Sequence, residues 1–506
     1  MAKTNRLRSG GNHAGPYCLV PGRKFRHGVV EAKIAPQIAA PATNRPYSVR
    51  AVRFFLVHRD NIAPQPDRKP LAVPMSLTRL ARGGAIAAVI KLTSAGLSFL
   101  MFLAVAVITD PRQFGLYSAA FAGASLVSFF SSVGQHSAVL RFWPQYASLG
   151  DPVTAQGFMA RSVRVTLGGV AIGGVLISAT ALLPGAVERT PEWVPLCLSA
   201  ALLSVALAWS EFSSGALRAK GVLVAALLPR DVVWRALLIA VALPLFWSGT
   251  HISAVEAILL TAGLLLLAVA PQTWTLLRHS FGAPKSALSP EQRQEFRTVT
   301  LGLWGITALP PALGQVSTLL VAGLLGAEVA GGVFVADRCT RLITLALHGM
   351  NQALAPEISS AFHNGNRAHV QRIASLTAWG STAIALLTLA IFWLFGDLVL
   401  RIFDPAYANP AMHWVLIIFA LGATVGPACG PVEMVLQMTG GQTTLFKVLV
   451  VSNLLGLLAT ATAAVLFGLV GAALAIAGTA AVSSLCALYV AKRRIGIDTS
   501  LLGLMR

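Results

Sequence analysis

Five basic residues lie inside long apolar stretches of this sequence, where charges are rare. They are Lys91, Arg230, Arg235, Arg338 and Arg341. A charge at the centre of a bilayer costs about 3 kcal/mol on insertion scales, so it is normally kept only where it faces a protein interior or a water-filled path. Guanidinium and ammonium groups bind anions strongly in such surroundings. The five cations therefore predict a cavity that holds an anion while it crosses a membrane.

The second half of the sequence carries a series of polar residues separated by three or four positions. They are Asp337, Arg341, Thr344, His348 and Asn351. This spacing places them on one face of a helix. Asp337 and Arg341 also have the spacing of an ion pair, and Arg338 beside them leaves one cation in excess. The pattern predicts a cavity-lining face; the alternative is a salt bridge that only joins packed helices.

A shorter polar group lies in the first half. Asp231 and Arg235 again have the spacing of an ion pair. Both residues lie in the span predicted over 222–247. If that span began later in the sequence, the Arg230 side chain would extend to the membrane surface, whereas Arg235 lies too deep to do so. Lys91 shares a helical face with two serines, and Glu211 lies near the end of its span, where a capping role is expected.

The composition indicates that these residues are surrounded by lipid. Of 506 residues, 55% are hydrophobic and only 11% are charged, whereas soluble domains carry roughly 25% charged residues. The apolar residues form blocks of about 20, which is long enough to cross ~30 Å of hydrocarbon as a helix. We therefore expect an all-α polytopic membrane protein.

Twelve candidate spans can be placed along the chain. They are 84–107, 118–139, 165–185, 192–213, 222–247, 253–276, 299–325, 330–353, 375–400, 413–437, 445–467 and 470–491. An even number of spans puts both chain ends on the same side, and the connections on that side carry most of the Lys and Arg residues. The positive-inside rule then predicts that both termini are cytoplasmic.

The spans divide into two sets of six. The longest polar connection in the bundle, 279–298, is the expected cytoplasmic linker between an N-terminal lobe over 75–278 and a C-terminal lobe over 299–495. The second span of each lobe opens with Gly-x-aromatic-x-Ala, and six spans per lobe preserve orientation. These features predict a parallel repeat around a central cavity. Residues 496–506 are expected to be a cytoplasmic tail.

Residues 1–74 differ from the rest of the chain. They hold 13 Lys and Arg against 3 acidic residues, which is half of the net charge of +20, and no apolar run long enough to span. They are a disordered cytoplasmic tail, a targeting peptide, or sequence upstream of a misplaced start codon. We favour the last because Met75 precedes a short basic stretch and the first span. Since the remaining basic excess lies in loops on one side of the membrane, nucleic-acid binding is not expected.

The sequence shows no motif for a metal, redox or nucleotide cofactor. The five cysteines lack the spacing of metal or redox sites, and no P-loop, HExxH or Rossmann glycine pattern occurs in a suitable context. We therefore expect neither a cofactor, a metal ion nor catalytic residues, and we do not expect an enzyme. Energy for transport would come from an ion gradient, the membrane voltage or the substrate's own gradient.

Several motifs between about 75 and 495 resemble those of a known family. They are Thr109–Tyr117, Ser132–Gln135, Arg141–Tyr146, Leu324–Ala336, Leu354–Glu357, Phe403–Tyr407, Thr439–Gln442 and Gly468–Leu474. The chain resembles the polysaccharide-biosynthesis flippases of the multidrug/oligosaccharidyl-lipid/polysaccharide exporter superfamily. The resemblance implies a two-lobed carrier that moves a polyprenyl-pyrophosphate-linked oligosaccharide across the inner membrane, alongside a polysaccharide polymerase and glycosyltransferases. Family members often carry an acid where this chain has Ser317, which puts ion coupling there in doubt.

These considerations give an expected substrate site. Arg235 and Arg341, one from each lobe, are expected to grip one pyrophosphate between two guanidinium groups. The other cations of the cavity are also expected to bind the substrate; they are Arg230, Arg338 and Lys91. The remaining polar residues are expected to line the cavity or to couple transport to an ion; they are Asp231, Asp337, His348 and Ser317.

Two other functions compete with this one. An organic-cation exporter of the same superfamily would need a net acidic, aromatic-lined cavity. An integral membrane glycan polymerase or transferase would need a large outer loop with a catalytic carboxylate or histidine, whereas the outer connections here are all short.

Overall fold

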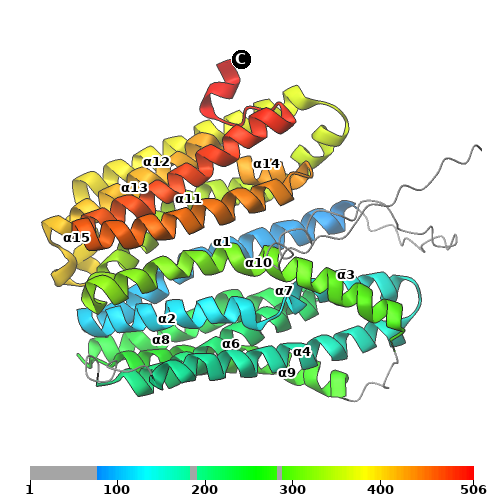
Figure 1. Ribbon diagram of the computed structural model, residues 1–506, viewed down its shortest axis with the longest axis horizontal. Coiled ribbons are helices and arrows are strands. Elements are labelled where there is room, and N and C mark those ends of the chain that lie inside the picture. The colour runs from blue at the N-terminus through cyan, green and yellow to red at the C-terminus, as the bar shows by residue number, and fades with distance from the viewer. Residues whose placement is uncertain (1–76, 183–190, 282–287, 506) are drawn as a thin grey trace, which may run out of the picture. The chain divides into compact units, whose positions relative to one another are not determined.

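A computed structural model describes residues 77–182, 191–281 and 288–505 (Figure 1). Some side chains in these ranges are not described, including that of His348, and the predictions for residues 1–74 lie outside the described residues. Every regular element in the described ranges is helical. The expectation of an all-α protein is therefore confirmed.

The first half of the chain forms the helices of the expected N-terminal lobe. They are α1 (Leu77–Val107), α2 (Pro111–Ser131), α3 (Gln135–Ser148), α4 (Pro152–Ala179), the short η2 (Thr180–Leu182), α6 (Trp193–Ala219), α7 (Leu223–Leu228), the π-helical η3 (Pro229–Val233), α8 (Trp234–Trp247) and α9 (Ala254–Phe281).

The second half repeats this arrangement with longer helices. They are α10 (Pro290–Leu325), α11 (Ala327–His363), α12 (Arg367–Phe403), η4 (Pro405–Tyr407), α13 (Pro410–Cys429), α14 (Val432–Met438), α15 (Gln442–Ile495) and η5 (Leu501–Met505). The expected linker 279–298 is largely helical where it is described, because α9 extends to Phe281 and a capping box at Ser289 starts α10.

Within the described ranges, nine helical stretches are long and apolar enough to cross a membrane. Three further spans follow from the helix bounds. α11 is long enough but carries the charged stripe, α7–η3–α8 runs unbroken from Leu223 to Trp247, and α15 is two helices joined at Gly468, whose φ is 62°. Each of the twelve spans predicted from sequence therefore has a helical counterpart.

Two of the predicted spans are broken near one end of the bundle. We call this the basic end; it carries the connections 149–151, 220–222, 364–366 and 439–441. The span predicted over 118–139 breaks between α2 and α3, where Val133 and Gly134 have φ of 47° and 66°. The span predicted over 413–437 breaks between α13 and α14 at Gly430, where φ is 76°.

The two halves meet tightly at the opposite end, where α2 crosses α11. A Cβ atom on Gly115 would lie 1.9 Å from the carbonyl oxygen of Ala327, and one on Gly331 would lie 3.1 Å from Gly115 Cα. Only glycine permits backbones to approach so closely. Nearby, the Tyr407 hydroxyl donates a hydrogen bond to the Pro111 carbonyl (3.2 Å). The contact between the halves thus joins Gly115 of the repeated motif to Gly331, the residue directly before the second copy of the motif.

Candidate functional site

A cavity of about 230 Å³ lies among α2, α3, α6, η3, α8, α9 and α10. Ten of its fourteen lining residues are polar or charged. The polar lining residues are Ser125, Ser128, Ser132, His136, Ser210, Glu211, Arg230, Asp231, Arg235 and Thr307. The cavity contains three of the predicted site residues and lies mainly in the N-terminal half.

The serines of α2 supply hydroxyl groups to one wall of the cavity. Ser125, Ser128 and Ser132 follow each other at three and four residues, so they share one helical face. Ser128 donates its hydroxyl proton to the Ser125 carbonyl (2.8 Å), which leaves its oxygen lone pairs free to accept hydrogen bonds. This wall is therefore suited to bind the hydroxyl groups of a ligand.

A π-helical turn positions the arginines of η3 and α8. Pro229 has no N–H group to bond to the Ala225 carbonyl, and the side-chain amide of Gln272 donates to that carbonyl instead. Arg235 Nη1 donates to the carbonyls of Arg230 (3.2 Å) and Asp231. A π turn has more residues per turn than an α-helix, so residues four apart no longer lie directly above one another. Arg235 therefore contacts the backbone carbonyl of Asp231 and not its carboxylate. The ion pair expected from their spacing is not formed.

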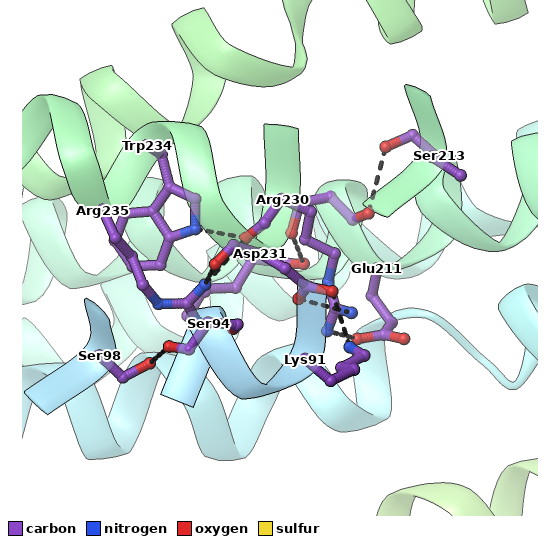
Figure 2. Close-up of polar contacts among 12 residues, drawn as sticks. Lys91, Ser94, Ser98, Glu211, Ser213, Arg230, Asp231, Trp234 and Arg235 are labelled. Carbon is purple, nitrogen blue, oxygen red and sulfur yellow. Dashed lines mark hydrogen bonds and ion pairs between the residues drawn. The ribbon is translucent and has the colours of Figure 1, made fainter. Parts of the chain in front are cut away.

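The carboxylates instead bind Lys91 and Arg230 (Figure 2). Lys91 Nζ lies 2.7 Å from Asp231 Oδ2, in an ion pair rather than a well-aligned hydrogen bond. Arg230 pairs with Glu211 of α6 and lies 3.7 Å from the other oxygen of Asp231. Two of the five predicted cations are therefore neutralised by acidic partners.

Arg341 is neutralised in the same way. Its Nε lies 2.8 Å from Asp337 Oδ2, which is the ion pair expected from their spacing. The Arg341 side chain is 58% exposed, so this part of α11 faces open space in the bundle, but Arg341 does not line the 230 Å³ cavity.

Arg235 and Arg338 are the two predicted cations that have no carboxylate oxygen closer than 4.0 Å among the described residues. Arg235 forms no salt bridge there, and Arg338 Nε lies 4.0 Å from an oxygen of Asp337 that Arg341 already binds. The Nε atom of each has no hydrogen-bond partner. These Nε atoms are buried, so what both side chains offer a ligand is a charge that no short ion pair neutralises.

Aromatic rings hold these two guanidinium groups in place. Arg235 stacks on Trp234 at 4.6 Å from the ring centre, while Arg338 lies 4.6 Å from the centre of Phe102 and 4.3 Å from that of Phe334. Cation–π contacts stabilise a guanidinium without neutralising it. Phe102 belongs to α1, which contacts both α8 and α11, and Arg235 and Arg338 are within range of mutual Coulombic repulsion. An anion between them would contact both halves.

The remaining predicted residues are less informative. Ser317 lies half-buried on α10 and does not line the cavity. The side chain of His348 lies outside the described residues. Among those residues, no group of three or more His, Cys, Asp or Glu side chains could hold a metal ion.

Sequence reasoning missed His136 and underrated Glu211. A Cβ atom on Gly215 would lie 2.6 Å from the His136 carbonyl oxygen, so α3 approaches α6 closely. This contact brings His136 within electrostatic range of Glu211, one turn before Gly215. The only local signal was the four-residue spacing of His136 from Ser132, whose hydroxyl contacts its Nδ1 at 3.2 Å.

The helical spans around a charged interior have the fold of a membrane transporter. An inward-facing multidrug resistance MATE family transporter of the MOP superfamily matches with a TM-score of 0.63 and 16% identity, over 81% of this chain and 98% of its own. The outward-facing form of such a transporter matches at 0.56 and 18%, over 82% and 95%. A MOP superfamily transporter from Pyrococcus furiosus, described as having a binding pocket of reverse polarity that suggests a different function, matches at 0.56 and 18%, over 82% and 96%.

Family models identify the family more closely. The model described as polysaccharide biosynthesis protein matches residues 80–362, more than half of the sequence, and the chain belongs to this family. The MatE model matches residues 307–462. Among curated proteins, none matches the sequence. The resemblance inferred from the motifs is confirmed: the family and fold are those of membrane transporters rather than enzymes.

Proposed function

We propose that this protein is a flippase that moves a polyprenyl-diphosphate-linked saccharide across the inner membrane by alternating access. One observation carries the proposal: Arg235 and Arg338 come from different halves, are partly buried, and have no carboxylate oxygen closer than 4.0 Å among the described residues. A diphosphate is a ligand that two guanidinium groups bind well, because each can donate two parallel hydrogen bonds. This pair replaces Arg235 and Arg341 as the proposed anion site.

The charge balance supports an anionic substrate. The cations Lys91, Arg230, Arg235, Arg338 and Arg341 face three carboxylates, those of Glu211, Asp231 and Asp337. The described group therefore carries two positive charges in excess, which would repel an organic cation in surroundings of low dielectric constant. This balance favours a lipid-linked saccharide over the organic cations of the exporter alternative.

The neighbouring cavity is suited to the saccharide. Serine hydroxyls, His136 and Thr307 line it, and such groups bind sugar hydroxyls through hydrogen bonds. The polyprenyl tail would stay in the lipid, which spares the protein a large apolar cavity. The substrate would thus be divided among a cationic site, a hydroxyl-lined cavity and the bilayer.

Contacts between the halves suggest which side opens. The glycine crossing of α2 and α11 and the Tyr407–Pro111 hydrogen bond close the end opposite the basic end. If the basic end is cytoplasmic, as the positive-inside rule predicts, this conformation accepts substrate from the cytoplasmic side. A glycosyltransferase would supply the substrate there, and a polymerase would use it on the other side.

The proposal is tested with purified protein in proteoliposomes. The substrate is a polyprenyl diphosphate that carries a fluorescent monosaccharide, and transport is read as exposure to a membrane-impermeant quencher. We expect Arg235→Ala and Arg338→Ala each to slow transport at least about tenfold, because a hydrogen bond to a charged group contributes about 1.5–3 kcal/mol. Arg→Lys at either position should be intermediate, since the charge remains and the fork is lost.

Arg164→Ala is the matched control, because Arg164 is exposed and its Nε donates to the Ala160 carbonyl within α4. Full transport by the Arg235 and Arg338 variants would contradict the proposed site. Transport of tetraphenylphosphonium but not of the lipid-linked sugar by the unmodified protein would establish the exporter alternative.

A further inference from the structure

The last residues of the chain fold back onto the C-terminal half. After α15 ends, Gly496 turns the chain with a φ of 73°, and residues 496–505, here named the C-terminal strap, lie against α12 (Figure 1). Ile497 and Thr499 are fully buried, and Asp498 and Ser500 are each 7% exposed. Residues 497–500, which the sequence predicted as part of a tail, are thus buried against the helices.

Helix α12 holds the strap through side-chain bonds to its backbone. Gln371 Nε2 donates to the Gly503 carbonyl (2.8 Å), and its Oε1 accepts from the Asp498 N–H (3.3 Å). Trp379 Nε1 donates to the Leu501 carbonyl (3.1 Å). Because these bonds fix backbone groups, they hold the strap at one position along α12.

The strap also occupies the break between α13 and α14. The Thr499 hydroxyl donates to the Cys429 carbonyl (2.8 Å), which is the last carbonyl of α13. Pro431 cannot supply an N–H group there. A Cβ atom on Gly430 would lie 2.2 Å from the Thr499 carbonyl oxygen, so the strap leaves the break no space to move. The strap therefore supplies a partner for the last carbonyl of α13, whereas the Gly430 N–H bonds to the carbonyls of Gly426 and Pro427.

An ion pair closes the base of the strap. Asp498 lies 2.9 Å from Lys492 Nζ of α15 and accepts hydrogen bonds from the N–H (3.1 Å) and hydroxyl (2.6 Å) of Ser500. Helices α12, α13 and α15 are thus joined through one short segment at the basic end.

We propose that the strap is a brace that holds the α13–α14 break shut, and that the break opens only when the strap is released. The inference is independent of the substrate, since it concerns the mobility of one element of the C-terminal half. It predicts that loss of a single strap contact loosens the break locally and leaves the N-terminal half unchanged.

Cys429 at the break is a natural reporter, because it is 3% exposed. Full-length protein in detergent is treated with N-ethylmaleimide, and the modification rate of each cysteine is followed by mass spectrometry. Thr499→Val removes the hydroxyl but keeps the side-chain shape, and we expect labelling of Cys429 to become about tenfold faster, because it leaves a buried carbonyl unpaired. Asp498→Asn is a second variant that should act in the same direction.

Thr388→Val is the matched control, since Thr388 is exposed and bonds only to the Ile384 carbonyl of its own helix among the described residues. Buried Cys197 and Cys339 report on the rest of the protein. An unchanged rate at Cys429 in both strap variants would overturn the proposal. An equal increase at Cys197 and Cys339 would also overturn it, because it would indicate general unfolding.

Discussion

The charge available at the boundary between the halves depends on which cation each carboxylate binds. Asp337 lies between two arginines, at 2.8 Å from Arg341 Nε and 4.0 Å from Arg338 Nε. Arg341 therefore forms the shorter ion pair with the only nearby carboxylate among the described residues, so the charge of Arg338 is less neutralised. Its role in the proposed site is indirect, which sequence spacing alone could not distinguish from direct binding.

This arrangement makes a prediction about Arg341. Arg341→Ala should slow flipping several-fold, because Asp337 becomes free to neutralise Arg338. Adding Asp337→Asn should restore much of the rate, since the competing carboxylate is removed. The measurement is the fluorescent flipping assay, with membrane abundance recorded for each variant. A double variant as slow as the single one would show that Arg341 itself contacts the substrate.

At the scale of elements, the π turn at Pro229 keeps Arg235 away from the Asp231 carboxylate. In a regular α-helix, residues four apart lie on the same face and would pair. One proline and the amide of Gln272 therefore preserve a free cation in the N-terminal half.

Pro229→Ala should allow this segment to become α-helical and bring Arg235 to Asp231. We expect transport to fall at least several-fold while thermal stability is unchanged or higher, because a proline inside a helix is replaced. Pro244→Ala in α8 is the control, as it changes a proline of the same span away from the cavity. Normal transport by Pro229→Ala would exclude this role for the turn.

The strap has a predictable response to pH. Burial acts to raise the pKa of Asp498, but the hydrogen bonds from Ser500 and the contact with Lys492 outweigh it and leave the pKa below its ordinary value. A carboxylate with a lowered pKa stabilises the folded state above its unfolded value, near ~3.9, and this contribution is lost as the pH falls through the folded value.

Asp498→Asn should therefore lower the melting temperature at pH 7, and this effect should shrink as the pH is lowered below about 3.9 toward 2. Melting curves of both proteins across this range test the expectation. An equal difference at both pH values would show that the charge of Asp498 does not stabilise the strap.

For the whole molecule, the sequence was sufficient to predict the class of fold. Apolar blocks of span length and basic connections gave twelve spans in two halves, because burial in lipid imposes its pattern directly on composition. The helix breaks at Gly134 and Gly430 were not predicted and lie inside two of the predicted spans. Hydropathy does not indicate backbone angles, so it could not locate them.

The site was predicted less well. The sequence identified Arg235 and Arg338 as buried cations, but their partners depend on contacts over long sequence separations. Lys91 meets Asp231 across 140 positions, and Glu211 meets Arg230 from another helix. His136 became a cavity residue only through the close approach of α3 to α6 at Gly215.

The orientation of the whole bundle remains a prediction that reporter fusions can test. Fusions after Gly150 and Asn366, at the basic end, should report a cytoplasmic location, and one after Ala408 should report the other side. The physical reason is the concentration of Lys and Arg in the helix ends that flank the connections of the basic end. The reverse pattern would invert the proposed direction of transport.

The contact between Gly115 and Gly331 gives the molecule a fulcrum. Because no side chains lie between the two backbones, α2 and α11 can change their crossing angle without first separating. Helix α11 runs from this contact to His363, which at 1.5 Å per residue is a lever arm of roughly 50 Å. A tilt of α11 by about 10° about the glycine contact would displace its far end by about 8 Å. A side chain at either glycine would push the fulcrum apart, so small residues at this one crossing set how far the basic end can swing.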